Sequence, residues 1–283
     1  MTAIHGAAAV VTGAANGIGR ALAFELAARG CDVALADRDA GGVQEAAAEI
    51  AQVHKVKLST HIVDVSQPKQ ITELASAVIS AHPQLNIVIN NAGVALSGQF
   101  HEISQDDMEW LININFWGVV HGTRAFLPHL RLQKEAHIVN LSSIFGIIAP
   151  PGQTAYSAAK FAVRGFSESL RHELEVSDSP VRLTVVHPGG VATKIARNAR
   201  VGAHMTDNLR RVQSIERFEA WVQTKPDAAA TRIVEGIEAN EPRVLIGKDA
   251  RGMDLLQRLF PATYWPRIAR KLEKLAAKSA GAR

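Results

Sequence analysis

The sequence predicts a doubly wound α/β fold, in which helices cover both faces of a parallel seven-stranded sheet. Short apolar runs alternate with longer helical stretches along most of the chain, which favours parallel strands joined by helical crossovers. Several runs are continuously apolar, as residues 87–89 and 185–186 show, and this is typical of strands buried on both faces. The chain has 283 residues, of which 47% are hydrophobic, and this is ample for one large α/β core.

The predicted strands are apolar runs rich in valine, isoleucine, leucine and alanine. In chain order they are residues 7–12, 31–36, 58–63, 85–90, 136–142, 181–186 and 243–246. The first is a β-branched and alanine run that ends in glycines. A helical stretch separates most neighbouring runs, so we expect the strands to run in the same direction.

The predicted helices lie between these strands. In chain order they are residues 18–29, 42–52, about 68–81, 108–132, 155–176 and about 227–239. Gly30 stops the first helix, and the second is rich in alanine. The fourth and fifth helices are much longer than the others.

Two regions lie outside this rhythm, residues 194–225 and residues 251–283. We expect one domain over residues 1–250 and a basic amphipathic C-terminal extension over residues 251–283. The net charge of +4 is uneven, because residues 243–283 carry +7 and the rest of the chain carries −3. This basic excess is too local and too modest to predict nucleic-acid binding.

Cys31 is the only cysteine, so no intrachain disulfide is expected, and its place at a strand start is typical of a small buried hydrophobe. No apolar run reaches the length of a transmembrane helix, and residues 1–9 lack the pattern of a secretory signal. We therefore expect a cytoplasmic protein. The eleven histidines show no metal-ligand spacing, so we expect no metal site, and we expect His187 to pack beside the sixth strand.

The turn after the first strand has the sequence TGAANGIG over residues 12–19 and leads into a helix. Glycines let the backbone approach a pyrophosphate closely, and the helix presents free N–H groups and its positive end to the phosphates. The turn therefore predicts a dinucleotide site that includes Gly13, Asn16, Gly17, Ile18 and Gly19. A tight strand-to-helix turn without a ligand is the alternative interpretation.

Asp37 ends the second strand, 18 residues after Gly19. A carboxylate there can accept hydrogen bonds from an adenosine ribose and repels a 2′-phosphate, which favours NAD over NADP. Arg38 can pair with such a phosphate, so NADP stays open. Asp37 is also a candidate N-cap for the next helix.

Tyr156 and Lys160 lie four residues apart and share one face of a predicted helix. Lowering a tyrosine pKa from about 10 to about 7 needs roughly 4 kcal/mol. One ammonium about 4 Å away can supply that in a partly desolvated site, so the pair is suited to exchange a proton with an alcohol. The alternative is a surface helix with an incidental tyrosine and lysine.

The chain resembles the short-chain dehydrogenase/reductase family in its single-domain form, over about residues 7–246. The motifs that carry the resemblance occur in the family order: the glycine turn, Asn90-Asn91-Ala92-Gly93, Asn115, Ser143 thirteen residues before Tyr156, the Tyr156-x-x-x-Lys160 pair, and Pro188-Gly189-Gly190-Val191-Ala192-Thr193. The resemblance implies a Rossmann-type fold and hydride transfer between a nicotinamide cofactor and an alcohol or ketone. We expect NAD as the cofactor.

The resemblance also implies a role for each matched residue. Tyr156 exchanges the hydroxyl proton, and Lys160 lowers its pKa and bonds the nicotinamide ribose. Ser143 polarises the substrate oxygen, and Asn115 holds a water that links Lys160 to solvent. The residues implied to line the cofactor are Asp64 at the adenine, Val65, Asn91, Ala92, Gly93, Pro188, Gly189, and, at the carboxamide, Val191 and Thr193.

Two of these assignments have a close competitor. Ser142 adjoins Ser143, and only the spacing to Tyr156 selects Ser143, which leaves Ser142 as a supporting hydroxyl. Asn113 and Asn115 compete for the catalytic position. We prefer Asn115, because it lies 41 residues before Tyr156 and is followed by an apolar residue.

We expect residues 194–225 to form a substrate lid. Its arginines are Arg197, Arg200, Arg210, Arg211 and Arg217. They can meet an acidic substrate group, but we favour a solvated helical face. The apolar side chains that follow the predicted catalytic serine are Ile144, Phe145, Ile147 and Ile148, and they indicate a pocket for a hydrophobic secondary alcohol or its ketone.

The expected partners of the chain are a membrane surface or another protein surface for the C-terminal extension, and further copies of the chain. The C-terminal extension can lie on a membrane surface or pack on protein, and we favour packing. The resemblance implies a homodimer or homotetramer built through helices 108–132 and 155–176. The competing functions are an NADP-linked carbonyl reductase and a non-catalytic dinucleotide-sensing protein.

Overall fold

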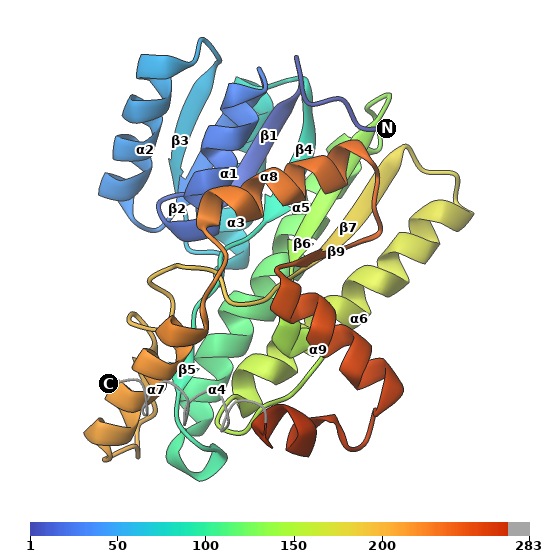
Figure 1. The fold of residues 1–283 in the computed structure, drawn as a ribbon. Helices are drawn as coiled ribbons and strands as arrows, with labels where there is room; N and C mark the ends of the chain where they lie inside the picture. The colour runs from blue at the N-terminus through green and yellow to red at the C-terminus, as the bar shows by residue number, and fades with distance from the viewer. Residues whose placement is uncertain (271–283) are drawn as a thin grey trace.

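Seven parallel strands form the central sheet of the computed structural model, which describes residues 1–270 (Figure 1). Their order across the sheet is β3-β2-β1-β4-β6-β7-β9. The strands are β1 (Ala8–Thr12), β2 (Asp32–Asp37), β3 (Leu58–Ile62), β4 (Leu85–Asn90), β6 (Ala136–Leu141), β7 (Val181–Pro188) and β9 (Arg243–Ile246). The winding direction reverses between β1 and β4, and ligands of open α/β sheets bind at the carboxyl ends of the strands beside such a reversal.

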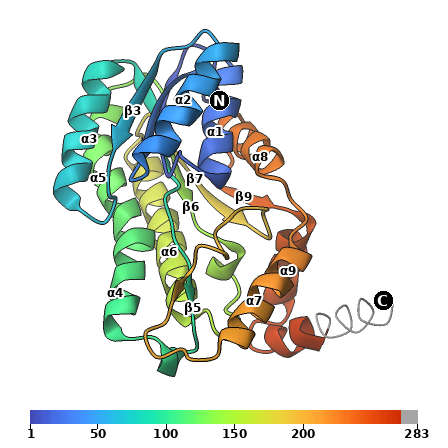
Figure 2. The same ribbon diagram turned by 90° about the vertical axis from the view of Figure 1, so that its left-hand side faces the viewer.

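Helices cover both faces of this sheet (Figure 2). They are α1 (Gly17–Ala28), α2 (Ala40–Val53), α3 (Pro68–Ala81), α4 (Gln105–Ile112), α5 (Gly118–Leu130), α6 (Thr154–Val176), α7 (Asn208–Trp221), α8 (Pro226–Glu238) and α9 (Lys248–Leu259). Buried side chains of α1, α2 and α8 pack on one face, and those of α3, α5 and α6 pack on the other. The predicted fold class is therefore confirmed.

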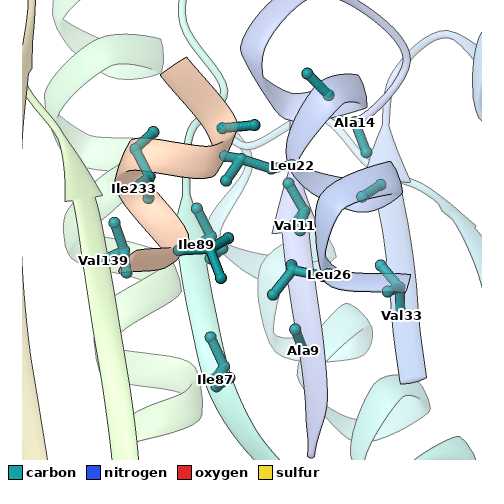
Figure 3. Packing of buried hydrophobic residues seen from close by; sticks show 14 of the residues in the cluster. Ala9, Val11, Ala14, Leu22, Leu26, Val33, Ile87, Ile89, Val139 and Ile233 are labelled. Atoms are coloured by element: carbon teal, nitrogen blue, oxygen red, sulfur yellow. The ribbon is translucent and has the colours of Figure 1, made fainter. Parts of the chain in front are cut away.

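The packing of the core on the α1 side explains why the central strands have continuously apolar sequences. Leu22 of α1 and Ile233 of α8 pack on Val11 and Ile89 of the sheet (Figure 3). The neighbouring Val10 points to the opposite face and packs with the α3 and α5 side chains. Because successive strand residues point to opposite faces, both sets of side chains must be apolar when both faces are covered.

Most predicted elements lie within two residues of their observed bounds, and α3, β4 and β9 coincide with the prediction. The single helix predicted over 108–132 is wrong. A π-turn, Asn113–Trp117, separates α4 from α5, and its last hydrogen bond joins Gly118 N to Asn113 O. The lid holds α7, which carries Arg210, Arg211 and Arg217 and has no buried residue, as the favoured solvated helical face requires. It also holds the two-residue strand β8 (Arg200–Val201), which pairs with β5 (Leu96–Ser97), and neither strand was predicted.

The described part of the C-terminal extension packs on its own chain. Ala250 and Ile268 are buried against Ile144, Ile147 and Ile148, which agrees with the packing that we favoured. The remainder of that extension, residues 271–283, lies outside the described residues. Among residues 1–270, no helix combines the length and the hydropathy that a membrane crossing requires.

Two histidines are buried in the sheet and make the fold sensitive to acid. Burial lowers the pKa of His137 to about 3 and that of His187 to about 4. The unfolded chain therefore binds protons below pH 6.5 that the folded chain does not, and stability falls as the pH falls. At pH 5 we expect each histidine to lower the free energy of unfolding by about 2 kcal/mol relative to pH 7.

Urea unfolding at several pH values between neutrality and pH 5 measures this effect. His137→Gln should flatten the dependence on pH, whereas His172→Gln, at an exposed position of α6, should leave it unchanged. Equal pH dependence in wild type and His137→Gln would show that His137 does not contribute.

Candidate active site

A cavity of about 560 Å³ opens at the carboxyl ends of the central strands, where the winding direction reverses. Its volume is in the range of small-molecule sites. The predicted residues that line it are Gly13, Asn16, Gly17, Ile18, Asp37, Arg38, Asp64, Val65, Asn91, Ala92, Gly93, Ser143, Tyr156, Lys160, Pro188, Gly189, Val191 and Thr193. The fold thus brings together segments that are distant in the sequence.

The glycine turn fits the phosphates of a dinucleotide. Gly13 and Gly17 have φ values of +71° and +56°, in the left-handed region that favours glycine. A Cβ atom on Gly13 would lie 2.8 Å from Ala92 Cα, and one on Gly19 would lie 2.0 Å from Gly13 O. Gly19 is therefore needed for the turn itself rather than for the cavity wall. Asn16 makes no side-chain cap on α1, so it leaves the first N–H groups of that helix uncovered.

Asp37 is fixed at the end of β2 by two backbone amides. Ala15 N donates to Asp37 Oδ2 at 3.1 Å, and Asp39 N donates to Asp37 Oδ1 at 3.1 Å. The interpretation of Asp37 as an N-cap is wrong, because α2 is capped by Asp39, whose Oδ1 accepts from Gly42 N at 3.0 Å. The Asp37 carboxylate therefore stays at the cavity beside Arg38.

Asp64 holds its own turn at the cavity. Its Oδ1 accepts hydrogen bonds from Ser66 N at 2.9 Å and from Ser66 Oγ at 2.7 Å. These two hydrogen bonds fix the Asp64 carboxylate beside Val65, and both residues line the cavity.

Ser143, Tyr156 and Lys160 meet in the same cavity. Ser143 follows β6, and its Oγ accepts a hydrogen bond from Phe145 N at 3.1 Å. Tyr156 lies in the first turn of α6, with its ring edge-on to Phe145 at 6.1 Å between centroids. Lys160 lies one turn later and is buried, with its Nζ 5.7 Å from the centroid of the Tyr156 ring and donating to Leu141 O at 2.9 Å.

Burial controls the protonation of this trio. It raises the pKa of Tyr156 to about 12, and a hydrogen bond with Ser143 acts in the opposite direction. Burial also lowers the pKa of Lys160 to about 8. The predicted tyrosine pKa near 7 is therefore wrong. Loss of solvent penalises the phenolate, and the Lys160 ammonium is directed to the carbonyl of Leu141.

The two competing asparagines differ sharply in their surroundings. Asn113 is exposed, whereas Asn115 is fully buried in the π-turn. Val94 N donates to Asn115 Oδ1 at 2.8 Å, and Asn115 Nδ2 donates to Val94 O at 2.9 Å. A Cβ atom on Gly93 would lie 3.3 Å from Asn115 Oδ1 and 3.6 Å from Lys160 Nζ, so Asn115 lies directly behind Gly93 in the cavity wall.

Ser142 and His187 form hydrogen bonds with the backbone of Lys160 and Ser143, respectively. Ser142 Oγ donates to Lys160 O at 2.8 Å, in keeping with a supporting hydroxyl. His187 is buried in β7, as predicted, and its Nδ1 lies 2.9 Å from Ser143 O. The low pKa of His187 keeps the ring neutral, so Nδ1–H is the donor in this contact.

The lid closes one side of the cavity, and three of its five arginines pair with carboxylates of the same chain. Arg200 Nε lies 2.9 Å from the buried Asp107, Arg210 pairs with Glu102, and Arg197 pairs with Glu219. Within the described part of the chain, none of the five lid arginines lines the cavity.

The sequence interpretation missed an apolar face of α7 that lines the cavity. It comprises Ile215, Phe218 and Trp221, and the polar lid residues Lys194, Asn198 and Ser214 line the cavity as well. The spacing of three residues between the apolar side chains was the signal that could have revealed a helix face. Ile144 and Phe145 line the opposite side, whereas Ile147 and Ile148 lie behind them in the core.

Comparisons with known proteins agree with this geometry. The sequence profile described as short chain dehydrogenase matches residues 7–203. The Mycobacterium tuberculosis protein SadH, which is named as an oxidoreductase, is 41% identical over 274 residues, covering 97% of this chain and 98% of SadH.

Two solved structures share the fold. A short-chain dehydrogenase/reductase from Burkholderia phymatum in complex with NAD has a TM-score of 0.85 and 29% identity, covering 94% of this chain and 97% of that one. An alcohol dehydrogenase from Thermococcus sibiricus complexed with 5-hydroxy-NADP has a TM-score of 0.71 and 25% identity, covering 85% and 94%. The resemblance drawn from the sequence is confirmed: this chain belongs to the short-chain dehydrogenase/reductase family of oxidoreductases.

Proposed function

We propose that the chain interconverts a hydrophobic secondary alcohol and its ketone with NAD(H), with Tyr156 as the proton donor and acceptor. The observation that carries the proposal is the meeting of Ser143, Tyr156 and Lys160 in the same cavity as the glycine turn. The reacting oxygen of a substrate placed there can lie within reach of the Tyr156 and Ser143 hydroxyls.

The residues divide the work of ketone reduction. The glycine turn, Asp37 and the loop after β7 would hold NADH, which would supply a hydride for the carbonyl carbon. Tyr156 donates its hydroxyl proton to the carbonyl oxygen, so the ketone gains one hydride and one proton and becomes the alcohol. The Ser143 hydroxyl donates a hydrogen bond to the same oxygen, and the Lys160 ammonium stabilises the phenolate that remains.

The protonation of Tyr156 favours one direction near neutral pH. With its pKa raised to about 12 by burial, Tyr156 keeps its proton and is ready to donate it. Alcohol oxidation needs the phenolate as base, so its rate should increase as the pH rises. The site is therefore best suited to ketone reduction at neutral pH.

The lining of the substrate side supports a hydrophobic substrate. Phe145, Phe218 and Trp221 face the cavity from both sides. Arg197, Arg200 and Arg210 of the lid pair with carboxylates, so these three arginines give no support to an acidic substrate group. Lys194 of the lid lines the cavity as well. A panel of aliphatic and aromatic ketones, followed by NADH absorbance, tests the activity. A chain that binds NADH and reduces none of them would favour the non-catalytic, dinucleotide-sensing alternative.

Asp37 supports NAD as the cofactor. Its carboxylate is fixed at the cavity edge, where it can accept hydrogen bonds from ribose hydroxyls and repels a 2′-phosphate. The neighbouring Arg38 also lines the cavity, so an NADP-linked carbonyl reductase is the second candidate.

Cofactor titrations with Asp37 variants test this preference. We expect wild type to bind NADH about 100-fold more tightly than NADPH. Asp37→Asn keeps a hydrogen-bond acceptor for Ala15 N and lacks the charge, so its affinity for NADPH should rise by at least about tenfold. Tighter binding of NADPH than of NADH by wild type would overturn the NAD assignment.

We also propose that the chain forms a homodimer or homotetramer through α4–α5 and α6. Trp117 and Phe161 lie on these elements and are partly exposed, which supports an apolar contact between copies. Analytical ultracentrifugation measures the oligomeric state, and a monomer at micromolar concentration would count against this proposal.

A further inference from the structure

The segment that follows β9 contacts both loops at the substrate end of the cavity. Asp249, in the first turn of α9, accepts a hydrogen bond from Gly190 N at 2.7 Å. The Tyr264 hydroxyl accepts a hydrogen bond from Ala149 N at 3.0 Å. Gly190 follows β7 and Ala149 follows β6, so one continuous segment holds two loops that the sheet itself leaves separate.

A buried apolar cluster joins this segment to the loop after Ser143. Ile144, Ile147 and Ile148 are buried against Ala250 and Ile268, and the ring of Trp265 packs on the same cluster. Well-packed apolar clusters fix relative positions, because any shift leaves voids that cost free energy.

Three side chains belong both to this cluster and to the cavity lining. Ile144 is buried in the cluster, and the rings of Phe145 and Trp221 pack against it. Phe145 in turn packs edge-on against Tyr156. A change in the C-terminal segment can therefore reach the substrate side of the cavity through these two rings.

The Asp249 carboxylate restricts the position of the loop after β7. A Cβ atom on Gly189 would lie 2.2 Å from Asp249 Oδ2, so the carboxylate occupies the space that a side chain would need. Gly189 and the following Val191 line the cavity. The Asp249 carboxylate thus determines how closely this loop approaches the start of α9.

The contact at Tyr264 restrains the chain more than it stabilises the fold. Ala149 is exposed, so water can satisfy its N–H when the Tyr264 hydroxyl is removed. Loss of that hydroxyl should therefore leave the fold intact and loosen the loop around Ala149. This separates a positioning effect from a general loss of stability.

We propose that residues 248–268 form a brace across the substrate side of the cavity, in which Tyr264 and Asp249 are positioning residues that set the affinity for the substrate. The proposal rests on the function proposed above. At its Tyr264 end the brace contacts only the loop after β6, so Tyr264 should act on substrate binding and leave dinucleotide binding unchanged. At its Asp249 end it contacts the loop after β7, which also lines the cofactor part of the cavity.

Hydrogen–deuterium exchange of the full chain with NADH bound tests the brace without turnover. In Tyr264→Phe, amides of residues 147–149 should exchange at least about threefold faster than in wild type, as expected for the loss of one hydrogen bond. In Asp249→Ala, the same should hold for the amides of residues 189–191, and Asp249→Asn should restore slow exchange, because it keeps an acceptor. Leu259→Ala, at an exposed position of α9, is the matched control and should exchange like wild type.

Steady-state kinetics on bulky ketones tests the consequence for the substrate. Tyr264→Phe and Asp249→Ala should raise KM about 3- to 10-fold with kcat unchanged. Tyr264→Phe, which removes no contact with the loop after β7, should also leave the Kd of NADH unchanged. A merely structural role would lower the melting temperature and affect NADH binding as well.

Each arm can overturn the proposal independently. Wild-type exchange rates in Tyr264→Phe would show that there is no brace, whatever the kinetics. Faster exchange with an unchanged KM would refute the effect on substrate affinity. If wild type reduces no ketone in the panel, the proposed function fails, and the exchange rates alone then decide whether the brace exists.

Discussion

Tyr156→Phe should lower kcat for ketone reduction by about 10³- to 10⁴-fold while the Kd of NADH stays close to the wild-type value. The substitution removes the hydroxyl that donates the proton and keeps the ring that packs edge-on against Phe145. Stopped-flow absorbance of NADH measures the chemical step, and quenching or enhancement of NADH fluorescence measures binding.

Ser157→Ala is the matched control for this experiment. It removes a hydroxyl from the adjacent residue of the same helical turn, and that hydroxyl is buried and has no hydrogen-bond partner among the described residues. The control should keep wild-type kcat. If Tyr156→Phe retained more than about a tenth of the wild-type kcat, another group would have to supply the proton.

Lys160→Met should lower kcat for ketone reduction by about 100-fold. Lys160 Nζ lies 5.7 Å from the centroid of the Tyr156 ring. A unit charge at about 6 Å stabilises a phenolate by about 3 kcal/mol at an effective dielectric constant near 20, which corresponds to about 100-fold in rate. Methionine keeps the apolar length of the side chain and removes the charge. Lys134→Met, at an exposed position, is the control and should leave kcat unchanged.

The dependence of kcat on pH gives this prediction a second readout. Burial lowers the pKa of Lys160 to about 8, so the ammonium loses its proton as the pH rises above that value. In wild type, kcat for reduction should therefore fall as the pH rises above about 8. In Lys160→Met this decrease should be absent. A wild-type kcat that is constant up to pH 10 would contradict a role for the Lys160 charge.

The sequence predicts the sheet well because its central strands β1, β2, β4, β6 and β7 are buried on both faces, and the resulting apolar runs are visible without any knowledge of contacts. Spacing also selects Ser143 over Ser142, whose hydroxyl donates to the backbone of Lys160. The strands β5 and β8 escape prediction because two residues are too few to show a period.

The errors concern properties that arise only in three dimensions. The pKa of Tyr156 depends on burial, which no spacing between Tyr156 and Lys160 can reveal. The N-cap of α2 falls on Asp39 rather than Asp37, because β2 extends one residue further than its apolar run. The contacts of Asp249 and Tyr264 join loops far away in the sequence, so their pattern carries no local signal.

The π-turn Asn113–Trp117 contains one residue more than a regular α-helical turn at the same place would contain. Each residue of an α-helix advances the direction of the side chains by about 100°, so α5 is turned relative to α4 by that amount. Removing a single residue from this stretch would straighten the helix and preserve its composition. It would also rotate the buried Asn115 away from Val94 and present a different stripe of α5 to the sheet. The number of residues between α4 and α5 is therefore constrained as tightly as the identity of those residues. Deleting one residue there would disturb more of the molecule than most single substitutions in the same segment.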